Sequence, residues 1–143
     1  MKTKFATLFA LLIVSVLISA CGTVISAPQG KTESVLSQEE ASALIDSALQ
    51  ALNTGDYAVW SRDWADDMKT AIQDSDFQNY RQQVVSQYGQ YVSIESIDIQ
   101  PGTQADRVRW VAIANFEQGR IKYAFSFLPD GRQVKGIFPE AVE

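Results

Sequence analysis

Hydrophobic residues recur with two different periods along the chain. Between Gln38 and Gly89 apolar side chains return every three or four positions, which is the spacing of an amphipathic helix. From Gln90 onward they return at every second position, which is the spacing of a strand with one buried face. This order predicts an α+β fold, in which N-terminal helices pack on a bent antiparallel sheet of about four strands.

Four helical segments are expected in the first half of the chain. Ser37 and Glu40 form the pattern of a capping box before the first apolar run, and Gly55 suits a left-handed helix end. Asp56 can cap a second, shorter helix, and Ser75 with Gln78 can begin the last one. The expected segments are Ser37 to Gly55, Asp56 to Trp60, Trp64 to Ile72, and Ser75 to Gly89.

The second half predicts four strands, of which the first contains a change of phase. Val92 and Ile94 share one face of that strand, whereas Ile97 and Ile99 share the other. This slip near Glu95 and Ser96 predicts a bulge or a sharp bend. The other strands are expected at 108–116, 121–127 and 133–138, after turns at Pro101-Gly102, Gln118-Gly119 and Pro129-Asp130-Gly131.

The middle turn predicts a register for the second and third strands. A two-residue turn at Gln118-Gly119 sets Glu117 opposite Arg120, so that opposite charges face each other. Small residues then oppose large ones on a single apolar face, and one polar pair lies on the other face. The expected pairs are Phe116 with Ile121, Ala114 with Tyr123, Ala112 with Phe125, Trp110 with Phe127, and Asn115 with Lys122.

A different pattern precedes the helices. Lys2 and Lys4 are followed by an uncharged apolar run that ends at Cys21, the single cysteine of the chain. The run is short for a membrane-spanning helix and has the form of a signal-peptide core. The sequence Ile18-Ser19-Ala20-Cys21 resembles the bacterial lipobox. The alternative is an uncleaved anchor helix with an incidental cysteine.

The lipobox resemblance implies lipidation and a cellular location. Cys21 would receive a diacylglyceryl group on its sulfur and become the first residue after cleavage. The chain then divides into a signal peptide (1–20), the lipidated cysteine with a flexible tether (21–35), and an α+β domain (36–143). Gly22 stands where aspartate often retains lipoproteins in the inner membrane. We therefore expect a lipid-anchored envelope protein, at the outer membrane if the host has one and otherwise at the outer face of the cell membrane.

The charge balance excludes several classes of function. The chain has 12 Lys and Arg residues against 17 Asp and Glu residues, and two of the lysines lie in the leader. An acidic domain of this kind is repelled by nucleic acid and by anionic lipid headgroups, so lipid must hold it at the membrane. Histidine is absent, which excludes a histidine-based catalytic triad and a histidine metal site. We expect no cofactor and no metal.

Three short motifs carry a resemblance to a family. They are Gly55-Asp56-Tyr57 after the first helix, Met68-Lys69 in the third segment, and Tyr88-Gly89 before the first long strand. Over roughly residues 36 to 138 the chain resembles a bacterial and archaeal family of small secreted or lipid-anchored domains of unknown function. That family is similar to the nuclear-transport-factor-2-like (cystatin-like, ketosteroid-isomerase-like) fold, a cone of helices and bent sheet. The resemblance implies this fold and no particular activity.

The acidic residues offer two candidate sites. Asp63, Asp66 and Asp67 lie at spacings of three and four, so on a helix they share one side and can bind a cation or favour the helix start. The latter role is expected, because three monodentate carboxylates are too few for calcium. Asp98 can act as a general base if it points into the cone, and otherwise it is a solvent-facing strand residue.

Aromatic side chains are the candidates for lining a pocket. Each of them can equally belong to the plain core. The candidates are Tyr57, Trp60, Trp110, Tyr123, Phe125 and Phe127. Trp64 and Tyr91 carry the same two interpretations. Arg107, Arg109 and Lys122 form a small basic spot that can meet an acidic group or face water.

The leading functional expectation is a non-catalytic accessory domain that binds a small apolar ligand or an envelope protein, or forms a homodimer through the sheet. The alternative is a small ketosteroid-isomerase-like enzyme that uses Asp98 or a tyrosine inside the cone. A deep pocket with a titratable group at its base favours the enzyme, whereas a filled cone with an exposed apolar patch favours a protein partner.

Overall fold

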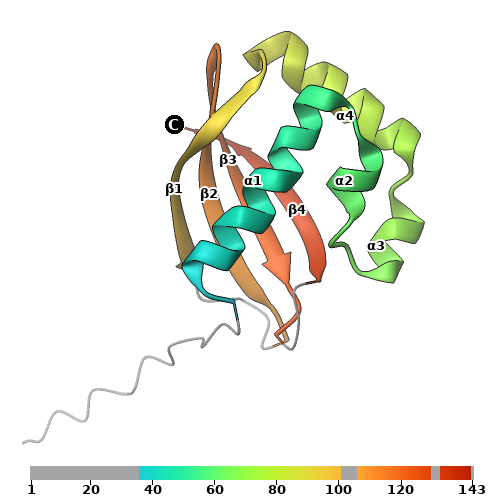
Figure 1. Cartoon of the computed structure of the whole chain (residues 1–143), viewed down its shortest axis with the longest axis vertical. Coiled ribbons are helices and arrows are strands. Elements are labelled where there is room, and N and C mark those ends of the chain that lie inside the picture. Colours follow the sequence, from blue (N-terminus) through green and yellow to red (C-terminus); the bar gives the residue numbers. More distant parts are fainter. Residues whose placement is uncertain (1–35, 101–105, 130–132, 143) are drawn as a thin grey trace, which may run out of the picture.

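A computed structural model describes residues 36–100, 106–129 and 133–142. Helices come first and strands second (Figure 1). The elements are α1 (Gln38–Thr54), α2 (Tyr57–Ser61), α3 (Asp66–Ala71), α4 (Asp74–Tyr88), β1 (Tyr91–Gln100), β2 (Val108–Phe116), β3 (Gly119–Phe127) and β4 (Val134–Ala141). The strands form one antiparallel sheet in the order β1-β2-β3-β4, and this confirms the predicted α+β class.

The predicted leader, lipobox cysteine and tether lie outside the described residues, as do the predicted Pro101-Gly102 turn and Asp130-Gly131. None of the helices in the described ranges has the length and apolar composition that crossing a membrane requires.

The predicted signals at the first two helices are confirmed. The Ser37 hydroxyl accepts the Glu40 N–H at 3.2 Å while the Glu40 carboxylate accepts the Ser37 N–H, so the capping box is complete. Gly55 ends α1 at φ 74°, a conformation that side chains with a Cβ rarely adopt. Asp56 caps α2 by accepting the N–H of Val59 at 3.1 Å.

The start of α4 differs from the prediction. Its cap is Gln73, whose N–H donates to the Asp76 carboxylate at 2.9 Å, and not Ser75 with Gln78. The amide of Gln78 instead donates to the carbonyl of Gly55 at 2.9 Å, which ties α4 to the end of α1. The Gln78 side chain, which the local pattern predicted to cap α4, therefore makes a tertiary contact instead.

The third helix is shorter than expected because its first residues pair with the sheet. Trp64 forms a parallel bridge with Val134. The Ala65 N–H donates to the Val134 carbonyl at 2.9 Å, and the Val134 N–H donates to the Asp63 carbonyl at 2.7 Å. This extended stretch joins the helical layer to β4 and leaves α3 to begin at Asp66.

The predicted irregularity of the first strand is confirmed. The pairing of β1 with β2 shifts between Ile94 and Ser96, and a second shift lies between Tyr91 and Ser93. The extra residue at Glu95 brings Ile94 and Ile97 to the same face, opposite Ala114 and Ala112. That face is covered by α1.

The predicted register of the β2–β3 hairpin is wrong by two residues. Phe116 pairs with Gly119, so that Glu117 and Gln118 form the turn. A shift of two leaves every side chain on its predicted face but changes its partner. The observed pairs are Asn115 with Arg120, Ala114 with Ile121, Ile113 with Lys122, Ala112 with Tyr123, Trp110 with Phe125 and Val108 with Phe127.

Contacts from the α4–β1 connection explain the shift. The Glu117 N–H donates to the Gln90 carbonyl at 3.0 Å, and the Glu117 carboxylate accepts the Gln90 N–H at 3.0 Å. The Gln118 N–H donates to the carbonyl of Tyr88 at 2.8 Å. Arg120, the predicted partner of Glu117, instead pairs with Glu95 on β1 at 3.2 Å.

The hydrophobic core lies between the helices and one face of the sheet. On the sheet side it contains Trp110, Tyr123, Phe125 and Phe127, and each of these is at most 4% exposed. The helices contribute fully buried aliphatic residues and one ring. They are Ile45, Leu49, Leu52 and Phe77.

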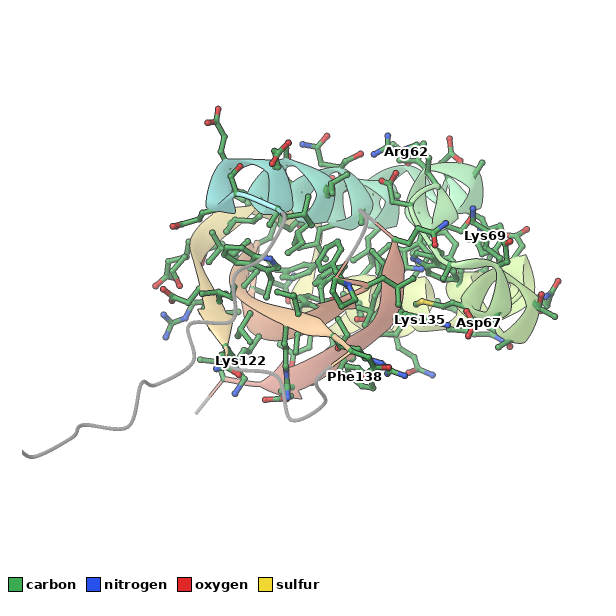
Figure 2. All side chains as sticks on the ribbon, turned by 90° about the horizontal axis from the view of Figure 1, so that it is seen from below. Arg62, Asp67, Lys69, Lys122, Lys135 and Phe138 are labelled. Carbon is green, nitrogen blue, oxygen red and sulfur yellow. The ribbon has the colours of Figure 1, made fainter. Side chains whose placement is uncertain are left out.

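The opposite face of the sheet points away from α1, and Phe138 and Lys122 project from that side (Figure 2). Lys122 and Arg109 both bind the Glu140 carboxylate, at 2.6 and 2.9 Å. These long side chains lie beside Val111, which is only 8% exposed on this face.

Candidate ligand-binding pocket

A pocket of about 280 Å³ lies where α2, α3 and α4 meet β4. Its walls are almost entirely apolar. They consist of Trp60, Trp64, Met68, Ile72, Asp76, Phe77, Tyr80 and Ile137. The volume is near the lower end of the range for small-molecule sites.

Four of the eight wall residues are aromatic. The centroid of Trp60 lies 5.3 Å from that of Phe77 and 6.1 Å from those of Trp64 and Tyr80. The four rings are tilted or perpendicular to their neighbours, which is a favourable arrangement for aromatic quadrupoles. Contact of an apolar guest with such a surface releases water, and this release favours binding.

Three contacts position the walls of the pocket. The Asp56 cap starts α2 and thereby places Trp60, and the bridge of Trp64 with Val134 fixes the next ring against β4. The hydroxyl of Tyr57 donates to the carbonyl of Ile72 at 2.5 Å, which joins α2 to the end of α3. The pocket is the space that remains between these three attachments.

Two tyrosine hydroxyls meet behind the aromatic wall. The hydroxyl oxygens of Tyr80 on α4 and Tyr123 on β3 are 2.7 Å apart. Tyr123 is fully buried, whereas Tyr80 is partly buried and lines the pocket. Burial raises the pKa of Tyr80 to about 12 although the bond from Tyr123 opposes the rise, and burial together with Tyr80 also raises the pKa of Tyr123. Both groups are neutral phenols at physiological pH.

Asp76 contributes the only carboxylate of the wall. It is exposed, and its oxygen accepts the N–H of Gln73 at the start of α4. The mouth of the pocket therefore carries a negative charge.

The structure divides the predicted pocket residues into two groups. Trp60 lines the pocket, and Tyr57 supports it through the bond to Ile72. Trp110, Phe125 and Phe127 are core residues, and Tyr123 contacts the pocket only through Tyr80. Trp64 lines the pocket and also belongs to the buried core, so both of its interpretations hold. The wall residues that sequence reasoning missed are Met68, Ile72, Asp76, Phe77, Tyr80 and Ile137.

Asp98 does not face the interior. It is exposed and pairs with Val111, on the face of the sheet that points away from the helices. Ile97 and Ile99, its neighbours, take the inner face opposite Ala112 and Trp110. The bulge at Glu95 sets this phase. The condition for Asp98 to act as a buried base is therefore not met, and the solvent-facing interpretation is correct.

Two of the three clustered aspartates bind basic side chains. Asp63 binds Arg62 at 2.7 Å, and Asp67 is bound by Lys135 of β4, which lies beside it in Figure 2. Lys135, through its hydrogen bond above all, lowers the pKa of Asp67. Within the ranges that the structure describes, no three acidic or cysteine side chains gather closely enough to hold a metal ion.

The basic spot is also partly neutralised. Glu140 lies between Arg109 and Lys122, whose bonds lower its pKa. Arg107 is 4.0 Å from Asp106. These contacts agree with a solvated sheet face more than with a site for an acidic partner group.

No protein-family model, curated protein or solved structure matches the chain.

Proposed function

We propose that this chain is a lipid-anchored envelope protein whose domain, a nuclear-transport-factor-2-like cone, binds a small and mainly apolar molecule. The observation that carries the proposal is the pocket between α2, α3, α4 and β4, with four aromatic side chains in its wall. Apolar pockets of this size bind small molecules because burial of the guest releases water from both surfaces.

A protein partner is less well supported by the exposed surface. In the described ranges the large apolar side chains with high exposure are Val92, Ile99 and Phe138. The first two lie on β1 and the third lies on β4, at opposite edges of the sheet. Scattered apolar residues of this kind do not form the contiguous patch that marks a protein interface. A homodimer through the sheet remains the alternative among macromolecular partners.

A ketosteroid-isomerase-like enzyme is the alternative among activities, and neither Asp98 nor Asp76 is placed to act as its base. Asp98 lies outside the cone, and the carboxylate of Asp76 is engaged at the start of α4. Tyr80 and Tyr123 have raised pKa values and are poor proton acceptors at neutral pH. A protein that binds a ligand without catalysing a reaction does not require any of these groups to exchange a proton.

The location follows from the leader. Acyl chains on Cys21 would hold the domain at the envelope, since each buried methylene contributes about 0.8 kcal/mol and two chains suffice for a stable anchor. A small-molecule pocket close to a membrane surface suits guests that partition into lipid. The proposed role is therefore to bind such a molecule at the outer membrane or, in a host with one membrane, at its outer face.

Native mass spectrometry of the full chain, released from its own membranes, tests the proposal. We expect a bound small molecule in addition to the lipid on Cys21. Ile72→Trp puts a large ring into the pocket and should abolish the adduct, whereas Val92→Trp, at a position 63% exposed on β1, should retain it. An adduct that persists in Ile72→Trp, or its absence from the unmodified chain, would contradict the proposal.

A further inference from the structure

The hydroxyl groups of Tyr80 and Tyr123 together have one more hydrogen-bond donor than the bond between them requires. Two hydroxyl groups carry two protons, and the bond between Tyr80 and Tyr123 uses one of them. In the described part of the chain neither hydroxyl has a second side-chain or backbone partner. A buried donor without an acceptor costs free energy, so the pair is suited to donate to a guest.

The position of the two rings indicates which hydroxyl donates outward. Tyr123 is fully buried on the sheet and does not line the pocket. Tyr80 lines the pocket wall. If Tyr123 donates to the oxygen of Tyr80, the Tyr80 proton is free to point toward the guest, and the first bond polarises the second.

A second donor at the same pocket lacks an acceptor. Trp64 is 2% exposed, and its indole N–H has no hydrogen-bond partner among the described residues. Trp64 is a wall residue of the pocket. The wall thus has unused donors, and its one acceptor, the Asp76 carboxylate, lies at the exposed mouth.

We propose that the guest of this pocket is a neutral aromatic carbonyl compound, whose ring packs among Trp60, Trp64 and Phe77 and whose oxygen accepts a hydrogen bond from Tyr80. This inference rests on the proposed function and specifies the class of ligand. The carbonyl supplies an acceptor for the donors that the described wall residues leave unpaired. An anionic group would be repelled by Asp76, and a plain hydrocarbon would leave the donors unpaired.

Fluorine NMR of the full chain in lipid nanodiscs tests this inference, with all three tryptophans replaced by 5-fluorotryptophan. Trp60 and Trp64 report on the pocket, whereas Trp110 lies outside its wall and serves as an internal reference for folding. The probes are acetophenone, ethylbenzene and benzoate, which share a ring and differ in the polar group. Empty nanodiscs give the correction for probe dissolved in lipid.

We expect acetophenone to shift the Trp60 and Trp64 resonances and to bind at least as tightly as the more hydrophobic ethylbenzene, with benzoate weakest. In Tyr80→Phe the ratio of the two affinities should move about tenfold toward ethylbenzene, which is the effect of one hydrogen bond. Tyr88→Phe makes the same chemical change outside this pocket and should leave the ratio unchanged.

The outcomes separate the two proposals. Two results would overturn the inference but not the proposed function of binding an apolar molecule. The first is that ethylbenzene binds and the ratio of the acetophenone and ethylbenzene affinities does not change in Tyr80→Phe. The second is that benzoate binds more tightly than acetophenone. If no probe moves the Trp60 and Trp64 resonances while Trp110 reports a folded chain, both proposals fail.

Discussion

The guanidinium of Arg81 on α4 donates to the carbonyl of Leu52 on α1 at 2.6 Å and to that of Asn53 at 3.1 Å. These carbonyls belong to the last turn of α1, which has no basic residue of its own. A cation at this end complements the helix dipole and satisfies acceptors that the helix leaves free. The contact also fixes α4, and with it Phe77 and Tyr80, over the core.

Arg81→Met should therefore destabilise the fold. It removes two charge-assisted hydrogen bonds and keeps most of the aliphatic packing, so we expect a loss of about 2 kcal/mol in the free energy of unfolding. Arg81→Lys keeps the charge but loses the two-pronged geometry and should lose less. Urea denaturation of the three proteins measures the difference. Equal stability of Arg81→Met and the unmodified protein would show that water replaces the cap at no cost.

The tyrosine pair predicts a loss of stability in alkali. A tyrosine in the unfolded chain loses its proton near pH 10, whereas burial keeps Tyr80 protonated up to about 12 and raises the pKa of Tyr123 as well. The unfolded state therefore binds fewer protons, and the free energy of unfolding falls as the pH rises through this window. Each such tyrosine adds a slope of about 1.4 kcal/mol per pH unit.

Tyr123→Phe should flatten this slope between pH 10 and 12 by about one tyrosine's contribution, about 1.4 kcal/mol per pH unit. Denaturant titrations at a series of pH values give the slope directly. An unchanged slope would mean that the Tyr123 hydroxyl is accessible to hydroxide in the folded state.

Gly89, between α4 and β1, should tolerate no side chain. Its backbone lies at φ 77° and ψ −160°, a region that is essentially restricted to glycine. A Cβ there would lie 2.8 Å from the Cβ of Glu117. We expect Gly89→Ala to lose more than about 2 kcal/mol, because backbone strain of about 1–3 kcal/mol adds to a displacement of the hairpin turn.

Gly136→Ala is the matched comparison. An added Cβ at this position would also be crowded, at 2.7 Å, but by the ring of Phe138. That ring is 50% exposed and can turn into solvent. The backbone of Gly136 is not in a left-handed conformation. The loss in the free energy of unfolding should therefore stay below about 1 kcal/mol. Thermal unfolding of both variants checks the order, and the reverse order would contradict this account of the α4–β1 connection.

Lipid attachment is tested at Cys21. Cys21→Ser removes the sulfur that would carry the diacylglyceryl group, so we expect the variant to lose the lipid mass and to leave the detergent-rich phase. The same partitioning of both proteins would contradict lipidation, and a mature N-terminus at a residue other than Cys21 in the unmodified protein would contradict cleavage at the lipobox.

The parts of the fold that were predicted correctly depend on neighbouring residues. Ser37 with Glu40, Gly55, and the phase slip at Glu95 are local signals, and the structure confirms each of them. The hairpin register failed because Glu117 binds Gln90, a residue 27 positions away. A local charge pair was outweighed by a contact that no short window contains.

The pocket could be predicted only in part for a similar reason. Trp60 and Trp64 are recognisable as candidates, but Phe77 and Ile137 are ordinary apolar positions of a helix and a strand. Whether such residues close into a core or leave a space depends on how α3 packs against β4. The bridge between Trp64 and Val134 decides this, and no periodicity in the sequence reveals it.

The most direct measurement of the central claim is a crystal structure of the protein under xenon pressure. Xenon occupies apolar cavities and needs no hydrogen bonds. The account predicts xenon density among Trp60, Phe77 and Ile137. A pocket without xenon, or one filled by the ring of Trp60 or Tyr80, would contradict the claim that this domain keeps a site open for a small apolar molecule.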